Sequence, residues 1–209
     1  MASNSPRRVV ILTGEAQGIG RGIALRLAND GFDLGLFDLP QCEDLLEDVA
    51  AEIRKAHGVR VSTIYGDVSV EEDVKRFVGT VVRELGDVYA MIANGAICTL
   101  HETPTETVDK LLSTNIKGVF LCYKYAAIRM IEQGKGGRII GATSSTGSFA
   151  VRGLTQSAAM EYGKYGTTVN AYGPGAFQNV LGKYGEPEDI AKLVSFLISD
   201  DASFIPGNW

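Results

Sequence analysis

The chain has 209 residues and a mass of 22.4 kDa, 45% of its residues are hydrophobic, and it carries a net charge of −5 at pH 7. This length suits one domain with a sizeable core, the negative charge disfavours a nucleic-acid surface, and no apolar run approaches the roughly 18 residues of a membrane span. Three widely spaced cysteines argue against disulfides and for a reducing compartment, the cytoplasm, and the two histidines lack partners at metal-ligand spacing.

Six short apolar runs alternate with segments of helical periodicity, a pattern typical of a parallel sheet covered by helices. The first run, residues 9–12, is continuously β-branched or leucine, which suits a strand buried on both faces. The other predicted strands are residues 34–37, 59–64, 88–93, 138–142 and 168–171. The pattern therefore predicts an α/β fold with a parallel sheet.

Hydrophobic residues at spacings of three and four predict helices between these strands. The clearest pattern covers residues 70–85, where Ser69 and Glu72 predict a capping box at its start. A second predicted helix start, threonine followed by proline, lies at residues 103–106. Further helices are predicted over residues 21–30, 115–132, 154–162 and 190–198.

A glycine-rich segment, residues 13–20, joins the first predicted strand directly to a predicted helix. Such a turn lets the backbone approach a pyrophosphate, and the helix N-terminus offers free N–H groups and the positive end of its dipole. A tight turn that serves only helix packing is the alternative, but the strand before and the helix after favour phosphate binding. We expect Gly14, Gly18, Ile19 and Gly20 to face the pyrophosphate, with Gln17 in the same site.

Asp38 ends the second predicted strand, 18 residues after Gly20. A carboxylate at this place accepts hydrogen bonds from both ribose hydroxyls of an adenosine, and it repels a 2′-phosphate. A solvated aspartate at a strand end is the alternative. The spacing thus predicts NAD rather than NADP as the cofactor.

The pattern Thr-Gly-x-x-x-Gly-Ile-Gly at residues 13–20 resembles the cofactor signature of the short-chain dehydrogenase/reductase family, whose other marks follow in order over nearly the whole chain. The resemblance implies a doubly wound, three-layer Rossmann-type sandwich with helices on both faces. It also implies that Asp67 and Val68 hold the adenine. Asn94 and Gly95, in a segment similar to the family's Asn-Ala-Gly, are expected beside the adjoining ribose.

Two catalytic positions also follow from the resemblance. Asn115, in Thr-Asn-Ile-Lys-Gly, resembles the family's catalytic asparagine, which supports a water in the proton relay; a helix cap is the alternative. Ser144 resembles the catalytic serine, and Ser145 is the close alternative. The pair Pro174 and Gly175 is similar to the family's turn beside the nicotinamide.

Residues 149–159 are similar to acetoin/diacetyl reductases and butanediol dehydrogenases. That resemblance implies hydride transfer between NAD(H) and a small ketone or secondary alcohol, of the acetoin, diacetyl or polyol kind. The helices over residues 115–132 and 154–162 resemble those of the family's dimer contact, so we expect a homodimer or homotetramer. Neither a nucleic acid nor a membrane is an expected partner.

The family's proton donor, a tyrosine with a lysine four residues later, is absent, because none of the eight tyrosines has a lysine at that spacing. Against the family pattern the sequence lacks three segments: roughly a dozen residues after 148, part of a loop of about 30 after 175, and a last strand of about ten. One interpretation is that the full protein contains these segments and is an active enzyme. The alternative is a truncated, NAD-binding form without catalysis that acts as a binding or interaction module.

Overall fold

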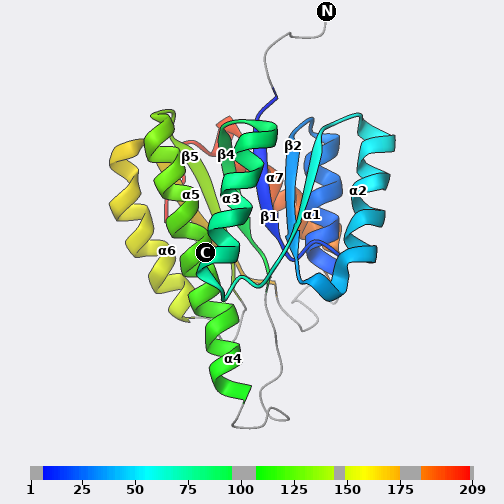
Figure 1. The fold of residues 1–209 in the computed structure, drawn as a ribbon. Helices are drawn as coiled ribbons and strands as arrows, with labels where there is room; N and C mark the ends of the chain where they lie inside the picture. The colour runs from blue at the N-terminus through cyan, green and yellow to red at the C-terminus, as the bar shows by residue number, and fades with distance from the viewer. Residues whose placement is uncertain (1–6, 96–106, 144–148, 175–184, 208–209) are drawn as a thin grey trace, which may run out of the picture.

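The computed structural model describes residues 7–95, 107–143, 149–174 and 185–207, which build a six-stranded, all-parallel sheet covered by helices on both faces (Figure 1). The strands are β1 (Val9–Thr13), β2 (Asp33–Asp38), β3 (Val61–Tyr65), β4 (Val88–Ala93), β5 (Gly137–Ala142) and β6 (Thr167–Tyr172). The predicted Rossmann-type sandwich is confirmed, and each predicted strand is present to within two residues at either end.

The helices form two layers, each with its own hydrophobic core against the sheet. Their bounds are α1 (Gly18–Asn29), α2 (Glu43–His57), α3 (Glu71–Leu85), α4 (Val108–Leu112), α5 (Val119–Gln133), α6 (Phe149–Tyr162) and α7 (Pro187–Ile198). In β1, Val10 and Leu12 pack with α1, α2 and α7, while Val9 and Ile11 pack with α3, α5 and α6. This alternation explains the continuous apolar run of the first strand, since both of its faces are buried. No helix among the described residues is long and apolar enough to cross a membrane.

The strand order is β3-β2-β1-β4-β5-β6, so the chain leaves β1 toward β2 on one side and later returns to β4 on the other. In a doubly wound sheet, a ligand crevice opens where the order reverses, at the carboxyl ends of the strands. The crevice therefore lies beyond the ends of β1 and β4, next to the glycine-rich turn.

The predicted capping box at the start of α3 is wrong. The helix begins at Glu71 after Val70, without a side-chain cap. Asp67 instead accepts the backbone N–H of Ser69 through Oδ1 at 2.8 Å, and Glu72 pairs with Lys75. An aspartate side chain readily bonds to the backbone N–H two residues later. The Ser69 N–H, which a capping box would need for Glu72, is therefore already bound to Asp67.

The helix predicted over residues 115–132 has a different start. A helical stretch runs from α4 through a π-helical segment, Ser113–Gly118, into α5 without a break. Asn115 lies inside this π-segment, so the alternative that it caps the start of a helix is wrong. The start signal at residues 103–106 lies outside the described residues. In Figure 1, α4 extends beyond the ends of the strands.

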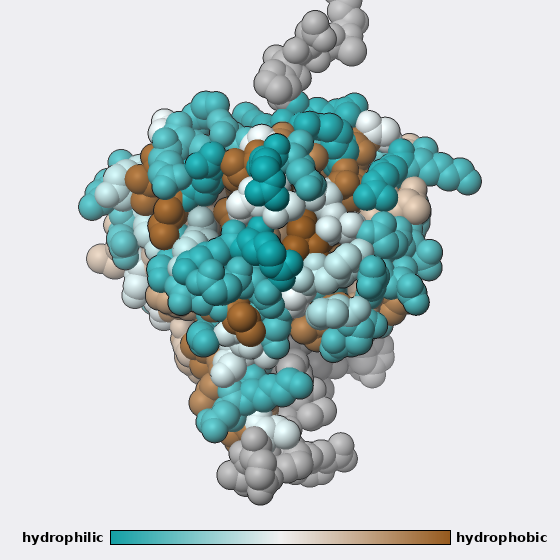
Figure 2. Space-filling model, viewed as in Figure 1, coloured by the Kyte–Doolittle hydropathy of each residue, from teal (hydrophilic) through white to brown (hydrophobic). Residues whose placement is uncertain are grey.

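Hydrophobic side chains remain on the surface along α4, α5 and α6. Leu112 and Phe120 are each about half exposed, and Phe149 and Met160 more so. A groove of about 550 Å³ lies along this surface, lined by Leu112, Ser113, Ile116, Lys117, Phe120 and Leu154. Figure 2 shows hydrophobic residues along the side of the α4 region, beneath a face that is mostly hydrophilic.

Candidate cofactor and active site

The turn after β1 and the segment after β4 touch each other across the crevice. The Asn94 side chain donates from Nδ2 to the Gly14 carbonyl at 3.1 Å, and Thr13 Oγ1 accepts the N–H groups of Asn94 and Gly95 at 3.2 and 3.3 Å. Gly14 has a φ of 85°, and a Cβ there would lie 2.9 Å from the Gly95 Cα. Only glycine suits this conformation and this approach.

The first turn of α1 packs directly on the same turn. A Cβ built on Gly20 would lie 1.9 Å from the Gly14 carbonyl oxygen, so a side chain cannot fit without moving the backbone. Gln17 lies at the N-cap of α1, but its side chain does not cap the helix, and the first turn holds no acidic residue. Gln17 and Gly18 are exposed, and Ile19 is half-buried. The N–H groups at this helix end suit an anion, and the residues present therefore fit a dinucleotide pyrophosphate.

Asp38 lies at the end of β2 beside this turn and is half-buried. Its Oδ2 accepts the Ala16 N–H at 2.9 Å and its Oδ1 accepts the Leu39 N–H at 2.8 Å. These bonds fix the orientation of the carboxylate, and each oxygen keeps capacity for another donor. Such a carboxylate fits a ribose diol and not a phosphate. Burial raises the pKa of the nearby Cys42 thiol, and the charge of Asp38 adds to that rise.

Asp67 and Val68 follow β3, next to the end of β2, where Gly66 donates its N–H to the Asp38 carbonyl at 3.0 Å. Asp67 also donates its N–H to Asp73 Oδ2 at 3.0 Å. Val68 packs inward, because a Cβ on Gly118 would lie 2.8 Å from the Val68 Cγ2. The predicted adenine pair thus connects the end of β3 with the π-segment.

Tyr172, at the end of β6, was not predicted as part of the site. Its hydroxyl donates to Asn94 Oδ1 at 2.6 Å, and its side chain is 1% exposed. Burial raises the pKa of Tyr172 above its ordinary value, so the hydroxyl keeps its proton and remains a donor. The ends of β1, β4 and β6 are therefore joined through the single side chain of Asn94. In the sequence, the one sign of this role is that Tyr172 directly follows the predicted strand 168–171, at the end of the sheet where the site is expected.

Of the residues expected at the catalytic end, only Asn115 and Pro174 lie within the described part of the chain. Asn115 is half-buried in the π-segment, and Pro174 is half-buried two residues after β6. Thr143 follows β5 and donates its N–H to the Tyr172 carbonyl at 2.8 Å, which joins the end of β5 to the end of β6. Ser144 and Gly175 themselves lie outside the described residues, as does Ser145.

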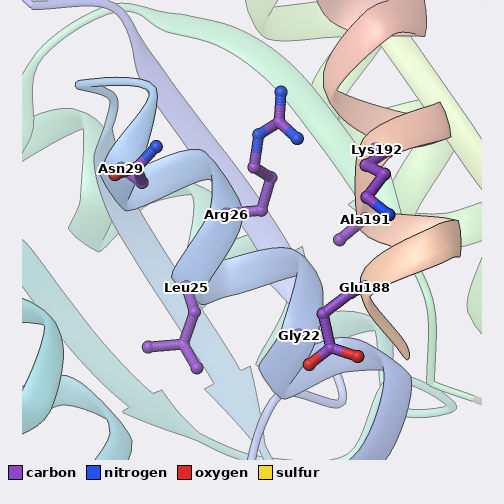
Figure 3. Close-up of a pocket in the computed structure, with 7 residues that line it drawn as sticks. All are labelled: Gly22, Leu25, Arg26, Asn29, Glu188, Ala191 and Lys192. Atoms are coloured by element: carbon purple, nitrogen blue, oxygen red, sulfur yellow. The ribbon is translucent and has the colours of Figure 1, made fainter. Parts of the chain in front are cut away.

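A separate hollow of about 270 Å³ lies between α1 and α7, and Figure 3 shows its lining. The residues are Gly22, Leu25, Arg26 and Asn29 of α1 with Glu188, Ala191 and Lys192 of α7. Arg26 and Lys192 are already paired with Asp30 and Asp189 on or beside their own helices. The helices approach closely here, since a Cβ on Gly22 would lie 2.8 Å from Pro187 Cβ, so we interpret this hollow as a packing seam.

Comparisons with known proteins agree with this geometry. The family model described as short chain dehydrogenase matches residues 8–188. A short-chain dehydrogenase/reductase of Armillaria gallica is 42% identical over 98% of this chain and 94% of its own length, and a diacetyl reductase ((S)-acetoin forming) of Staphylococcus epidermidis is 34% identical over 96% and 95%. A solved structure of an NAD+-bound xylitol dehydrogenase superposes with a TM-score of 0.89, 26% identity, and coverage of 99% of this chain and 97% of that one.

The two sequence alignments each extend over 246 positions, 37 more than the 209 residues of this chain. These relatives therefore carry at least 37 residues that face gaps in this chain. The family match nevertheless runs from the residue before β1 to the start of α7, with the strand order intact. The chain belongs to the short chain dehydrogenase family, and it is an oxidoreductase.

Proposed function

We propose that this oxidoreductase uses NAD(H) in preference to NADP(H). The observation that carries the proposal is Asp38, a carboxylate held by two backbone N–H groups beside the glycine-rich turn. Both hydroxyls of an adenosine ribose can donate to it, whereas a 2′-phosphate would be repelled. A structural neighbour with NAD+ bound supports the same choice.

For the substrate we propose a small ketone or the corresponding secondary alcohol, of the acetoin, diacetyl or polyol class. The support is the diacetyl reductase among the relatives together with the family-like Asn115. The nicotinamide of the cofactor would supply or accept the hydride. In this proposal Ser144 orients the carbonyl group, Asn115 holds a water of the proton relay, and Pro174 with Gly175 borders the nicotinamide.

The second candidate concerns the 209-residue form alone: within this family of oxidoreductases, that form would bind NAD(H) without turnover. It is favoured by one observation, that no tyrosine of the 209 residues is followed four residues later by a lysine. The family uses that pair to donate the proton, and a positioned proton donor contributes about 10²–10⁴-fold to such a reaction. The gaps against the relatives agree with this candidate as well as with a longer natural form.

Two measurements on the same purified chain separate these candidates. NADH and NADPH binding is followed by nucleotide fluorescence, and NADH oxidation is followed at 340 nm with diacetyl and with acetoin. Tight NADH binding with turnover supports the enzyme, and tight binding without turnover supports the binding form. Tighter binding of NADPH than of NADH refutes the proposed cofactor. The intact mass of the protein from its natural source then tells whether the 22.4 kDa chain is the natural form.

We also propose that the chain forms a homodimer or homotetramer through α5 and α6. The support is the exposure of Phe120, Ile128, Phe149 and Met160 on these helices, since monomeric proteins rarely leave such patches uncovered. Light scattering after gel filtration measures the assembly. The variant Phe120→Asp should shift it toward the monomer, and a monomeric wild-type chain would contradict the proposal.

A cytoplasmic location is the remaining part of the proposal. Its support is the sequence itself, because the three cysteines Cys42, Cys98 and Cys122 are odd in number and widely spaced, which favours a reducing compartment. Cell fractionation with detection of the natural protein tests it, and recovery from the medium or a membrane fraction would contradict it.

A further inference from the structure

Glu15 is a carboxyl group buried beneath the candidate cofactor site. It follows Gly14 in the glycine-rich turn, and its side chain is 0% exposed. Its Oε2 accepts the Phe37 N–H at 3.1 Å, while its Oε1 is buried without a hydrogen-bond partner. A buried polar atom without a partner costs stability, so its presence calls for a cause other than stability.

Asp33, at the opposite end of β2, shows how a structural carboxylate is treated in the same fold. It is also buried, at 1% exposure, and it accepts the Arg60 N–H and the Arg60 Nε at 2.8 Å each. Among the ion pairs of the described residues none includes Glu15. Asp33 is thus neutralised by a cation, and Glu15 is not.

Three consecutive residues of the turn form hydrogen bonds to the end of β2. Gly14 donates its N–H to the Phe37 carbonyl at 2.9 Å, Glu15 accepts the Phe37 N–H, and Ala16 donates its N–H to Asp38 Oδ2 at 2.9 Å. Of the three residues of the turn, only Glu15 contributes its side chain, whereas Gly14 and Ala16 contribute backbone N–H groups. A substitution at Glu15 therefore removes the contact to Phe37 and leaves the donors of the other two contacts in place.

The groups around Glu15 are acids or neutral. Its charged neighbour is Asp38 at the end of β2, and its other titratable neighbours are Cys122 on α5 and Tyr172 on β6. Burial and then the charge of Asp38 raise the pKa of Glu15 well above its ordinary value, which two backbone N–H groups offset only in part. Burial raises the pKa of the Cys122 thiol to about 12 and that of Tyr172 above its ordinary value, so both stay protonated near neutral pH.

We infer that Glu15 is a positioning residue for the adenosine end of the cofactor, which holds the end of β2 so that Asp38 faces the ribose. This inference rests on the proposed use of NAD(H). In its protonated form Glu15 adds no charge below Asp38 and the pyrophosphate. Once ionised, it places a second negative charge beside two anionic groups, so the affinity for the dinucleotide falls as pH rises through the pKa of Glu15.

The experiment measures the Kd for NADH from pH 5.5 to 9 in the wild type, Glu15→Gln and Glu15→Ala, with Glu132→Gln on the surface of α5 as the matched control. Wild type and control should bind about threefold or more weakly at the alkaline end. Glu15→Gln keeps the acceptor for Phe37 and should match the wild type at pH 5.5 while losing the pH dependence. Glu15→Ala should bind about tenfold more weakly at every pH.

Two results would overturn the inference: a Glu15→Gln profile that follows the wild type, or a folded Glu15→Ala that binds NADH as the wild type does. If Glu15→Ala does not fold, the profile of the nearly isosteric Glu15→Gln decides alone. Asp38→Ala separates this inference from the proposed function. Unchanged NADH binding in Asp38→Ala refutes the ribose role of Asp38, whereas weakened binding there with no effect at Glu15 refutes only the inference.

Discussion

The two ends of the site are built in different ways. At the expected adenosine end, residues at or just after the ends of β1, β2 and β4 bond to one another, as in the contacts of Gly14 with Asn94 and of Ala16 with Asp38. At the catalytic end, Asn115 comes from a π-segment between two helices, and Ser144 and Gly175 adjoin the places where the family pattern is interrupted. The first end depends on strand termini, and the second depends on segments between them.

In this fold, cofactor binding and proton transfer therefore depend on different segments of the chain. The glycine-rich turn and Asp38 need only the β1–α1–β2 unit and its neighbour β4, which are complete in this chain. Proton donation in the family needs a tyrosine with a lysine four residues later on the same helix face, and this sequence contains no such pair. Variants at the adenosine end therefore test the complete half of the site directly.

The largest effect is expected from Gly20→Ala. The new Cβ would lie 1.9 Å from the Gly14 carbonyl oxygen and 2.7 Å from the Asn94 Nδ2, so the turn must open. We expect NADH binding to weaken by about 100-fold or more, measured by fluorescence titration. Gly153→Ala is the control, because a Cβ at that helical position meets nothing within 4 Å. Equal affinities in the two variants would show that the turn does not bind the dinucleotide.

Asp38→Ala should weaken NADH binding by about tenfold and improve the tolerance of NADPH, because the variant loses the ribose acceptor and the repulsion together. The ratio of the two Kd values is the measurement. Asp87→Asn is the matched control, an aspartate at the opposite end of the sheet that pairs with Lys135. A preference for NADH that survives in Asp38→Ala would move cofactor selection to another residue.

Glu15→Gln should raise stability at alkaline pH. Because the pKa of Glu15 is raised in the folded chain, its contribution to stability is full below the ordinary carboxyl pKa and is lost as pH rises toward the folded value. Glutamine does not ionise, so we expect a gain in Tm of about 4 °C at pH 8 and none near pH 4.5. Scanning calorimetry at the two pH values measures it, and a gain that is independent of pH would contradict ionisation as the cause.

The smallest effect is expected from Tyr172→Phe, which removes the hydrogen bond to Asn94 Oδ1 and leaves the ring in place. The free energy of unfolding should fall by about 1 kcal/mol, and the Kd for NADH should rise about twofold through the freed Asn94. Tyr165→Phe is the control, because Tyr165 is 42% exposed. A Tyr172→Phe variant with unchanged stability and affinity would show that Asn94 is held by Gly14 and Thr13 alone.

Sequence patterns predicted the sheet well, because buried parallel strands are continuous apolar runs and the glycine-rich turn connects one of them to a helix. The helices were predicted less evenly. The α2 helix was not singled out, and the start of α3 was assigned to Ser69 because the pattern does not reveal that Asp67 bonds to that N–H group. Competition between neighbouring polar side chains for one donor depends on their positions in three dimensions.

Within the candidate site, Gly14, Gly20 and Asp38 were predicted from the glycine-rich turn and the spacing after it, and Asn94 was predicted from the family resemblance. Glu15 and Tyr172 were not found, because a charged residue in a polar turn and a tyrosine in a strand are both ordinary in sequence. What distinguishes them is complete burial next to polar partners. That property arises only when β1, β2, β4 and β6 come together.

The π-segment Ser113–Gly118 limits how this region can change length. A π-turn holds one residue more than an α-turn, so deleting a residue there would favour a regular α-helix, which turns about 100° per residue. The buried face of α5, which includes Cys122 and Ala126, fixes that helix against the sheet. Because the π-segment takes up its extra residue within its own turn, a single-residue deletion here would leave α4 and α5 in their present orientations and would shift only the side chains of the segment itself, Asn115 among them.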